Sequence, residues 1–309
     1  MNIVKNEIKL KIGNYEVHSI PTGVFGLDGG SMFGTVPKVL WEKSIPADEQ
    51  NRIPMEARCL LLKSKDCNIL IDVGNGHDFV PKYGEKLGGK FAEMYNISEE
   101  GPSLKTSLQK HGLGFESIDY VFLTHLHFDH SGGGTCFKNG EIVPTFPRAK
   151  YFLQKKNLET AQYPNVRERS SYFSVNYEPL IQNHQLVLLD GMSIIDSTKE
   201  KSVNEIIPEV NLFVTQGHTL GQQHPLFSDG KNNLFYCADL IPTSYHVRLA
   251  WIMGYDLDSL KIISEKKEIL NQASDHNWNL FFEHDPFCDL ALVEKDKHDF
   301  KISQRMDLL

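Results

Sequence analysis

Three histidines and an aspartate lie within six residues at the end of an apolar segment. The segment covers residues 120–123, and the run THLHFDH at 124–130 follows it. Alternate side chains of a strand share a face, so His125 and His127 are expected on one side. Asp129 and His130 are expected in a turn, because glycines follow at 132–134.

Hydrated groups at the end of a buried strand cost free energy unless a partner compensates them. A single histidine is usually an ordinary core or surface residue, but three within six positions favour a metal site. Imidazole and carboxylate ligands together suit zinc, iron, manganese or cobalt rather than calcium or magnesium. The run therefore predicts a transition-metal site.

The pattern His-x-His-x-Asp-His after an apolar strand resembles the signature of the metallo-β-lactamase-fold hydrolases. Three later positions match further ligands of that family, each directly after an apolar segment, and they are His218, Asp239 and His284. Upstream, Asp72 follows the apolar segment 68–71 and resembles an aspartate that supports the site without binding metal. The resemblance covers the chain from about residue 20 to about residue 286.

The resemblance implies two divalent metal ions held by seven side chains, which are His125, His127, Asp129, His130, His218, Asp239 and His284. In this scheme one ion is bound by His125, His127 and His218. The other ion is bound by Asp129, His130 and His284, and Asp239 bridges the two ions. Zinc is expected, with manganese, iron and cobalt as alternatives. A hydroxide that bridges the ions would attack the substrate, and Asp129 would orient it and pass a proton to the leaving group.

The sequence predicts many short strands and few helices, which indicates an α/β protein. The clearest helix covers residues 258–273, where apolar side chains recur at helical spacing. A second covers 103–111, with Ser103 as its N-cap, and strands at 57–63 and 67–72 read as a hairpin. The resemblance adds the architecture: an α+β four-layer αβ/βα sandwich of two mixed β-sheets flanked by helices. Residues 1–309 are expected to form one domain.

Several segments outside the ligands resemble the branch of quorum-quenching lactonases and methyl parathion hydrolases. They are residues 28–34, 36–38, 41–43, 51–54 and 238–246, followed by Trp251 and residues 255–256. Met32 and Phe33 are expected to form a pocket wall; the alternative is that they are core residues that anchor a long loop. Pro242 stands where lactonases of this branch carry a tyrosine. Tyr245 or His246 would have to substitute for it, although His246 alone fits a structural histidine better.

Three functions remain open. The first is a lactonase that opens N-acyl homoserine lactones or related lactones. The second is a phosphotriester, phosphodiester or arylester hydrolase, which the missing tyrosine favours slightly. The third is a non-catalytic metal-binding protein, which the complete ligand set disfavours because such a protein needs no second metal ion.

The composition limits the classes of binding partner and the cellular compartment that we expect. The 309 residues carry a net charge of −8 without a basic stripe, which argues against nucleic acid. The five cysteines are scattered and form no Cys-x-x-Cys pair, which indicates a reducing compartment. Residues 1–9 lack the apolar core of a signal peptide, and no segment is apolar enough to span a membrane. We therefore expect a cytoplasmic enzyme for a small ester or lactone, and the resemblance suggests a homodimer.

Overall fold

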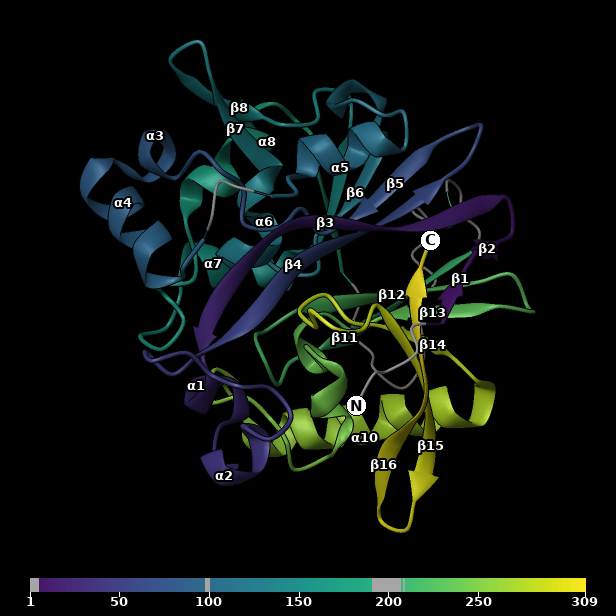
Figure 1. Ribbon diagram of the computed structural model, residues 1–309. Helices are drawn as coiled ribbons and strands as arrows, with labels where there is room; N and C mark the ends of the chain where they lie inside the picture. The colour runs from purple at the N-terminus through teal and green to yellow at the C-terminus, as the bar shows by residue number, and fades with distance from the viewer. Residues whose placement is uncertain (1–5, 98–100, 191–206, 208) are drawn as a thin grey trace. The chain divides into compact units, whose positions relative to one another are not determined.

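The computed structural model describes residues 6–97, 101–190, 207 and 209–309 (Figure 1). The chain divides into two compact units. Unit 1 comprises residues 1–19, 28–53 and 191–309, and unit 2 comprises residues 20–27 and 54–190. The single domain expected from the sequence stays a prediction.

Unit 2 holds most of a seven-stranded mixed sheet, whose β2 and the start of β3 belong to unit 1. Its order is β10 (Leu186–Leu189), β9 (Lys150–Gln154), β6 (Tyr120–Phe122), β5 (Asn68–Ile71), β4 (Arg52–Lys63), β3 (Tyr15–Asp28) and β2 (Leu10–Ile12). Strands β5, β6 and β9 run parallel, with Ile69 opposite Tyr120 and Tyr120 opposite Lys150. The carboxyl ends of parallel strands meet at one edge of a sheet, so Asp72 and the THLHFDH run emerge side by side.

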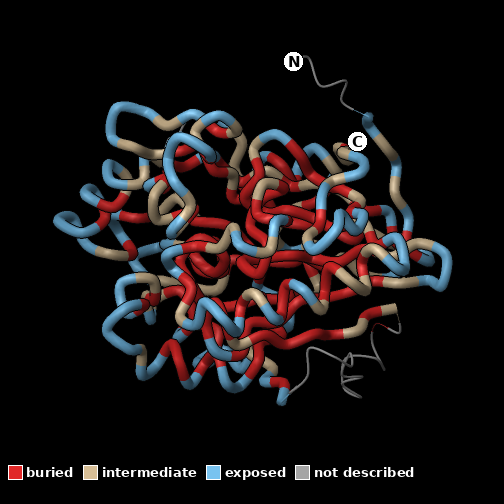
Figure 2. The backbone as a smooth tube through the Cα atoms, turned by 90° about the horizontal axis from the view of Figure 1, so that it is seen from below, coloured by how far each residue is buried: buried red, intermediate tan, exposed pale blue. Residues whose placement is uncertain are grey.

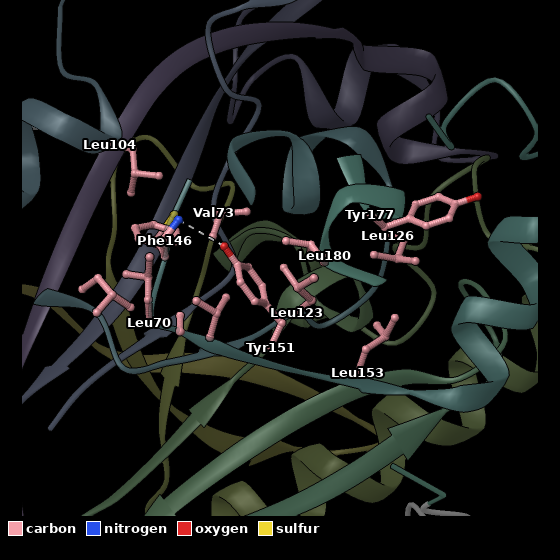
Figure 3. Close-up of a cluster of buried hydrophobic side chains, with 14 of the residues drawn as sticks. Leu70, Val73, Leu104, Leu123, Leu126, Phe146, Tyr151, Leu153, Tyr177 and Leu180 are labelled. Carbon is pink, nitrogen blue, oxygen red and sulfur yellow. Dashed lines mark hydrogen bonds between the residues drawn. The ribbon is translucent and has the colours of Figure 1, made fainter. Parts of the chain in front are cut away.

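The other elements of unit 2 are short. They are α3 (Phe79–Tyr83), α4 (Glu85–Met94), α5 (Leu104–Lys110), η1 (Phe115–Ser117), α6 (Phe128–Ser131), η2 (Gly132–Gly134), β7 (Thr135–Lys138), β8 (Glu141–Pro144), α7 (Lys155–Gln162), η3 (Ser174–Asn176) and α8 (Glu178–Gln182). Ser103 caps α5 as predicted, because its side chain accepts a hydrogen bond from the backbone of Thr106. The core of the unit gathers around Tyr151, whose hydroxyl accepts a hydrogen bond from the backbone of Phe146 (Figure 3).

Unit 1 holds the second mixed sheet. Its order is β1 (Glu7–Ile8), β16 (Asp299–Leu308), β15 (Leu290–Asp296), β14 (Asn279–Phe281), β13 (Asn233–Tyr236), β12 (Gln222–Ser228) and β11 (Val210–Thr215). Strands β13 and β14 run parallel, with Leu234 opposite Asn279. Asp239 and His284 therefore follow two strand ends at one edge. Strands β11 and β12 are antiparallel, and His218 lies in the loop that joins them.

The long helix of unit 1 covers one face of this sheet. Helix α10 (Ser259–His276) begins after Asp258, whose side chain accepts hydrogen bonds from the backbone of Leu260 and Lys261. Its buried side chains Ile262 and Ile269 belong to a core shared with strands of this sheet, and Figure 1 shows the helix beside those strands. The remaining elements are α1 (Gly29–Phe33), α2 (Lys38–Trp41), η4 (Ala238–Leu240) and η5 (Ser244–Val247).

The α+β class with two mixed sheets and helices is confirmed. The helices at 103–111 and 258–273 are confirmed within a few residues. The turn expected at Asp129 and His130 is wrong, because both residues lie in the short helix α6. Most residues of β5, β12 and β13 are buried, whereas the turns at residues 139–140 and 229–231 are exposed. Figure 2 colours the backbone by the burial of each residue. Among the described helices, none has both the length and the apolar character needed to cross a membrane.

Candidate metal centre

The THLHFDH run forms a compact polar group in unit 2. The side chains of His125 and His130 are fully buried, and those of His127 and Asp129 nearly so. Nε2 of His125 lies 3.0 Å from Nδ1 of His127. Nε2 of His130 lies 3.9 Å from a carboxylate oxygen of Asp129. Unit 2 therefore brings together all four ligands that the sequence predicts there.

Asp72 holds this group in place from the end of β5. One carboxylate oxygen accepts a hydrogen bond from the backbone of Thr124 at 2.7 Å, and the other accepts one from its hydroxyl, also at 2.7 Å. The second oxygen also lies 3.0 Å from Nδ1 of His130. Asp72 has a positive φ of 54°, a conformation that aspartate tolerates better than most residues. This fully buried carboxylate fixes the ring of His130 with Nε2 directed away from it.

The THLHFDH run is also held from the segments that follow β9. The side chain of Asn157 accepts a hydrogen bond from the backbone of Leu126 at 2.9 Å. The carboxylate of Glu168 lies 3.6 Å from Nε2 of His127, and both side chains are buried. These contacts orient His127 from the side opposite to His125.

The glycines after the run are needed for close packing rather than for a turn. A Cβ atom on Gly132 would lie 2.1 Å from the carbonyl oxygen of Asn75, and one on Gly133 would lie 2.1 Å from that of Val73. Neither glycine has a positive φ. The backbone after α6 thus packs directly on the loop that follows Asp72.

Unit 1 brings together the other three predicted ligands around Asp239. Nε2 of His218 lies 3.1 Å from one carboxylate oxygen of Asp239, and Nε2 of His284 lies 3.2 Å from the other. All three side chains are buried. A carboxylate whose two oxygens face two different histidines has the arrangement that a bridging ligand requires.

The loop that carries His218 is held by two acidic side chains that the sequence did not single out. The carboxylate of Asp256 lies 3.0 Å from Nδ1 of His218. Glu265 of α10 accepts hydrogen bonds from the backbone of Gln216 and Gly217 at 2.9 and 3.0 Å. A Cβ atom on Gly217 would lie 2.6 Å from the backbone nitrogen of Ile262, so the loop lies directly against the helix.

The charges of unit 1 favour a cation at His218. Burial alone would lower the pKa of this imidazole, but the carboxylates of Asp239 and Asp256 raise it to about 10. Burial also raises the pKa of Asp256. The negative potential that holds a proton on His218 would equally hold a divalent ion.

Both groups have the chemistry of transition-metal ligands. Donor atoms of His125 and His127 lie within 4.8 Å of one another, and so do those of His218 and Asp239. Zinc–nitrogen bonds are about 2.0–2.1 Å long, so one ion can reach two such atoms. Buried carboxylates orient Nδ1 of His130 and of His218, which is how proteins prepare histidines for metal. The residues present therefore fit the metal ions that the sequence predicts.

Comparison with known proteins identifies the family. The sequence profile of the metallo-beta-lactamase superfamily matches residues 53–284, from the start of β4 to His284. The chain belongs to the metallo-β-lactamase superfamily. It is a hydrolase of this superfamily, and its two mixed sheets with helices are consistent with the predicted αβ/βα sandwich.

Relatives within the superfamily include lactonases. An N-acyl homoserine lactonase of Bacillus cereus is 29% identical over 188 residues, which cover 60% of this chain and 63% of the relative. The match thus spans less than two thirds of that relative's length. A probable metal-dependent hydrolase from Staphylococcus aureus has a similar structure, with a TM-score of 0.81, 25% identity and coverage of 96% of this chain and 98% of the other.

AidC, a dizinc quorum-quenching lactonase with a bound N-hexanoyl-L-homoserine product, shares the fold. Its TM-score is 0.72 at 22% identity, with 97% of each chain covered. This likeness concerns the fold alone.

The residues of unit 1 that are predicted to contact the substrate differ in what their side chains touch. Met32 and Phe33 are buried, and Phe33 stacks on Trp41 and on His246 with ring centroids 5.3 and 4.7 Å apart. These contacts match the alternative of core anchors. A substrate contact by either residue stays a prediction.

His246 has both ring nitrogens engaged. Nε2 lies 2.8 Å from the carbonyl oxygen of Met32, and Nδ1 lies 2.8 Å from the hydroxyl of Thr243. Burial lowers its pKa to about 3, so the ring is neutral. It therefore has the contacts of a structural histidine, whereas the neighbouring Tyr245 is only partly buried and lies beneath Arg305, with the guanidinium 5.3 Å from its ring centroid.

Sequence reasoning missed the side chains that orient the ligands from outside the motifs. Asp256, Glu168 and Asn157 belong to this set. Asp256 lies two residues before the N-cap of α10, where an aspartate ordinarily indicates only a helix start. No local pattern distinguishes Glu168 or Asn157 from other polar residues of their segments.

Proposed function

We propose that the ligand group of unit 2 and the ligand group of unit 1 form one dinuclear metal centre. Asp239 carries this proposal, because each of its oxygens faces a different histidine in unit 1. Zinc is the proposed metal, with manganese, iron and cobalt as alternatives. The match of one superfamily profile across both groups supports the joint centre.

We further propose that this centre opens the ring of N-acyl homoserine lactones or related lactones. Support comes from the similarity to the Bacillus cereus N-acyl homoserine lactonase. Two divalent ions at the centre would acidify a shared water and polarise the lactone carbonyl. Asp129 would hold the proton released in the attack and deliver it to the leaving oxygen.

Proton release tests this function directly. Metal-loaded protein is mixed with a long-chain N-acyl homoserine lactone, and ring opening is followed in weakly buffered solution. We expect turnover by the parent and a loss of roughly 100-fold or more in kcat for Asp129→Ala. Metal content and thermal unfolding of the variant are the controls for site and fold. Absence of proton release from parent protein that holds two metal ions would refute the proposed lactonase activity.

A phosphotriester or arylester hydrolase is the second candidate. The residue Pro242 favours it, because it stands where lactonases of the resembling branch carry a tyrosine. His246 has both ring nitrogens engaged and so cannot replace that tyrosine. Tyr245 has the guanidinium of Arg305 over its ring. Good leaving groups need little acid assistance, so a nitrophenyl phosphotriester and a nitrophenyl ester are the test substrates. Faster turnover of either than of the lactone would select this candidate.

A further inference from the structure

A cavity of about 370 Å³ lies within unit 1, apart from every predicted metal ligand. It is bounded by the segment after α2, by η5 and the residues after it, and by β16. Its four charged lining side chains are all cationic: Lys43, Arg248, Lys301 and Arg305. Its volume falls in the range of small-molecule sites.

Three of these four cations lack a carboxylate partner. Lys301 pairs with Glu294 at 3.1 Å. Across the described ranges, no carboxylate forms an ion pair with Lys43, Arg248 or Arg305. Asp285 lies close to this wall of the cavity, where its carboxylate accepts hydrogen bonds from the backbone of Ser244 and Phe287. Three cations that line the cavity thus have no ion-pair partner among the described residues.

Two buried polar atoms at the cavity have no hydrogen-bond partner among the described residues. One is the hydroxyl of Ser244, a residue only 3% exposed, and the other is Nη1 of Arg305. A buried donor without an acceptor costs about 1–3 kcal/mol. Both atoms belong to residues that line the cavity, and an oxyanion bound there would offer an acceptor to each donor.

Aromatic side chains make the walls of this cavity flat. The guanidinium of Arg248 lies 5.1 Å from the ring centroid of Trp251, and Arg305 lies over Tyr245. The wall of Arg248 and Trp251 is held in position by Lys266. Lys266 donates hydrogen bonds to the carbonyls of Arg248 and Trp251 at 2.8 and 2.7 Å. Guanidinium groups held over rings present their donors edge-on to a planar or tetrahedral oxyanion.

We propose that this cavity binds a small organic oxyanion, a phosphonate, phosphate or carboxylate attached to a flat apolar body. Arg305 and Ser244 bind the oxyanion, and Trp251 and Tyr245 contact the body. The proposal goes beyond the hydrolase activity. No lining residue is a predicted metal ligand, and Tyr245 is the one lining residue that is also a predicted substrate contact.

Calorimetric titration of the metal-loaded protein with phenylphosphonate tests the site. A dinuclear centre also binds phosphonates, so we expect two binding events in the parent. Arg305→Gln should weaken one event roughly ten- to a hundredfold and leave the other unchanged. Arg148→Gln, which removes an exposed arginine of unit 2, should retain both events. Benzoate in place of phenylphosphonate distinguishes a carboxylate site from a phosphonate site, and neutral benzyl alcohol should not bind.

Ser244→Ala keeps the test decisive if Arg305→Gln fails to fold. Its hydroxyl has no partner in the cavity, so its removal should leave the melting temperature unchanged or higher while the same event weakens roughly three- to tenfold. A single event in the parent that neither substitution alters would overturn the proposal. Equal weakening of both events by Arg148→Gln would overturn it as well.

Discussion

The two ligand groups consist of similar metal-binding side chains, but the fold positions and supports them differently. In unit 2, four ligands come from one continuous run, and a single carboxylate, Asp72, holds both Thr124 and His130. In unit 1, three ligands follow three separate strands, and Asp256 holds the ring of His218 and the backbone of Met253. Asp72 thus accepts both donors of Thr124 and contacts a ligand ring, whereas Asp256 contacts one ligand ring and one backbone N–H outside the ligand group. The two groups should respond differently to loss of their carboxylates.

The largest difference is expected between Asp72→Ala and Asp256→Ala. Each substitution should lower zinc affinity about 10–100-fold, because each frees a ligand ring. Asp72→Ala should also lower the free energy of unfolding of metal-free protein by at least about 2 kcal/mol more, since it strands two buried donors of Thr124 as well. Zinc competition titration and denaturant unfolding measure the two effects.

The asparagine variants serve as controls for this pair. Asp72→Asn and Asp256→Asn keep an acceptor oxygen at each position, so they should recover part of the affinity. Equal losses of stability for the two alanine variants would contradict a difference in how the groups are supported.

The glycines beside the two ligand groups differ in how closely they approach neighbouring backbone. Gly132→Ala would bring a Cβ within 2.1 Å of a backbone oxygen in unit 2, and Gly217→Ala would bring one within 2.6 Å of a backbone nitrogen in unit 1. We expect each to lower the free energy of unfolding by about 1–3 kcal/mol, with the larger effect at Gly132. Gly89→Ala, in helix α4 with open space around it, should stabilise by about 0.5–1 kcal/mol. If all three variants melted alike, the close contacts would be refuted.

A buried lysine of unit 1 gives a pH-dependent prediction of smaller size. Burial lowers the pKa of Lys266 from 10.5 to about 7. The unfolded chain then binds more protons than the folded chain between about pH 7 and pH 10.5, so the free energy of unfolding should rise with pH in that window. Lys266→Met should flatten this part of the profile, as denaturant unfolding at several pH values would show. An unchanged slope in the variant would contradict the low pKa.

Sequence alone predicts unit 2's group better than unit 1's group. The THLHFDH run indicates metal by composition, because no ordinary strand end carries so many imidazoles. His218, Asp239 and His284 are each unremarkable in isolation, and only the family resemblance identified them. What brings them together is the pairing of β11, β12, β13 and β14, which depends on contacts between distant residues.

The errors of the sequence-based prediction have physical causes. The glycines after His130 indicated a turn, but they are small so that two backbone segments can touch. The hairpin of β15 and β16 was missed because β16 alternates weakly between buried and exposed positions. Asp256 belongs to a segment that resembles the lactonase branch, but the sequence assigned it no role, because its contact with His218 follows from the path of the chain before α10.

The metal stoichiometry of a double variant distinguishes one dinuclear centre from two separate sites. In the proposed dinuclear centre, His125 and His218 bind the same ion, although they belong to different ligand groups. Zinc per chain, measured by mass spectrometry after desalting, should be two for the parent and one for His125→Ala or His218→Ala. The double variant should still hold one. If each single variant holds one ion and the double variant holds none, the two groups are separate sites and the dinuclear centre is refuted.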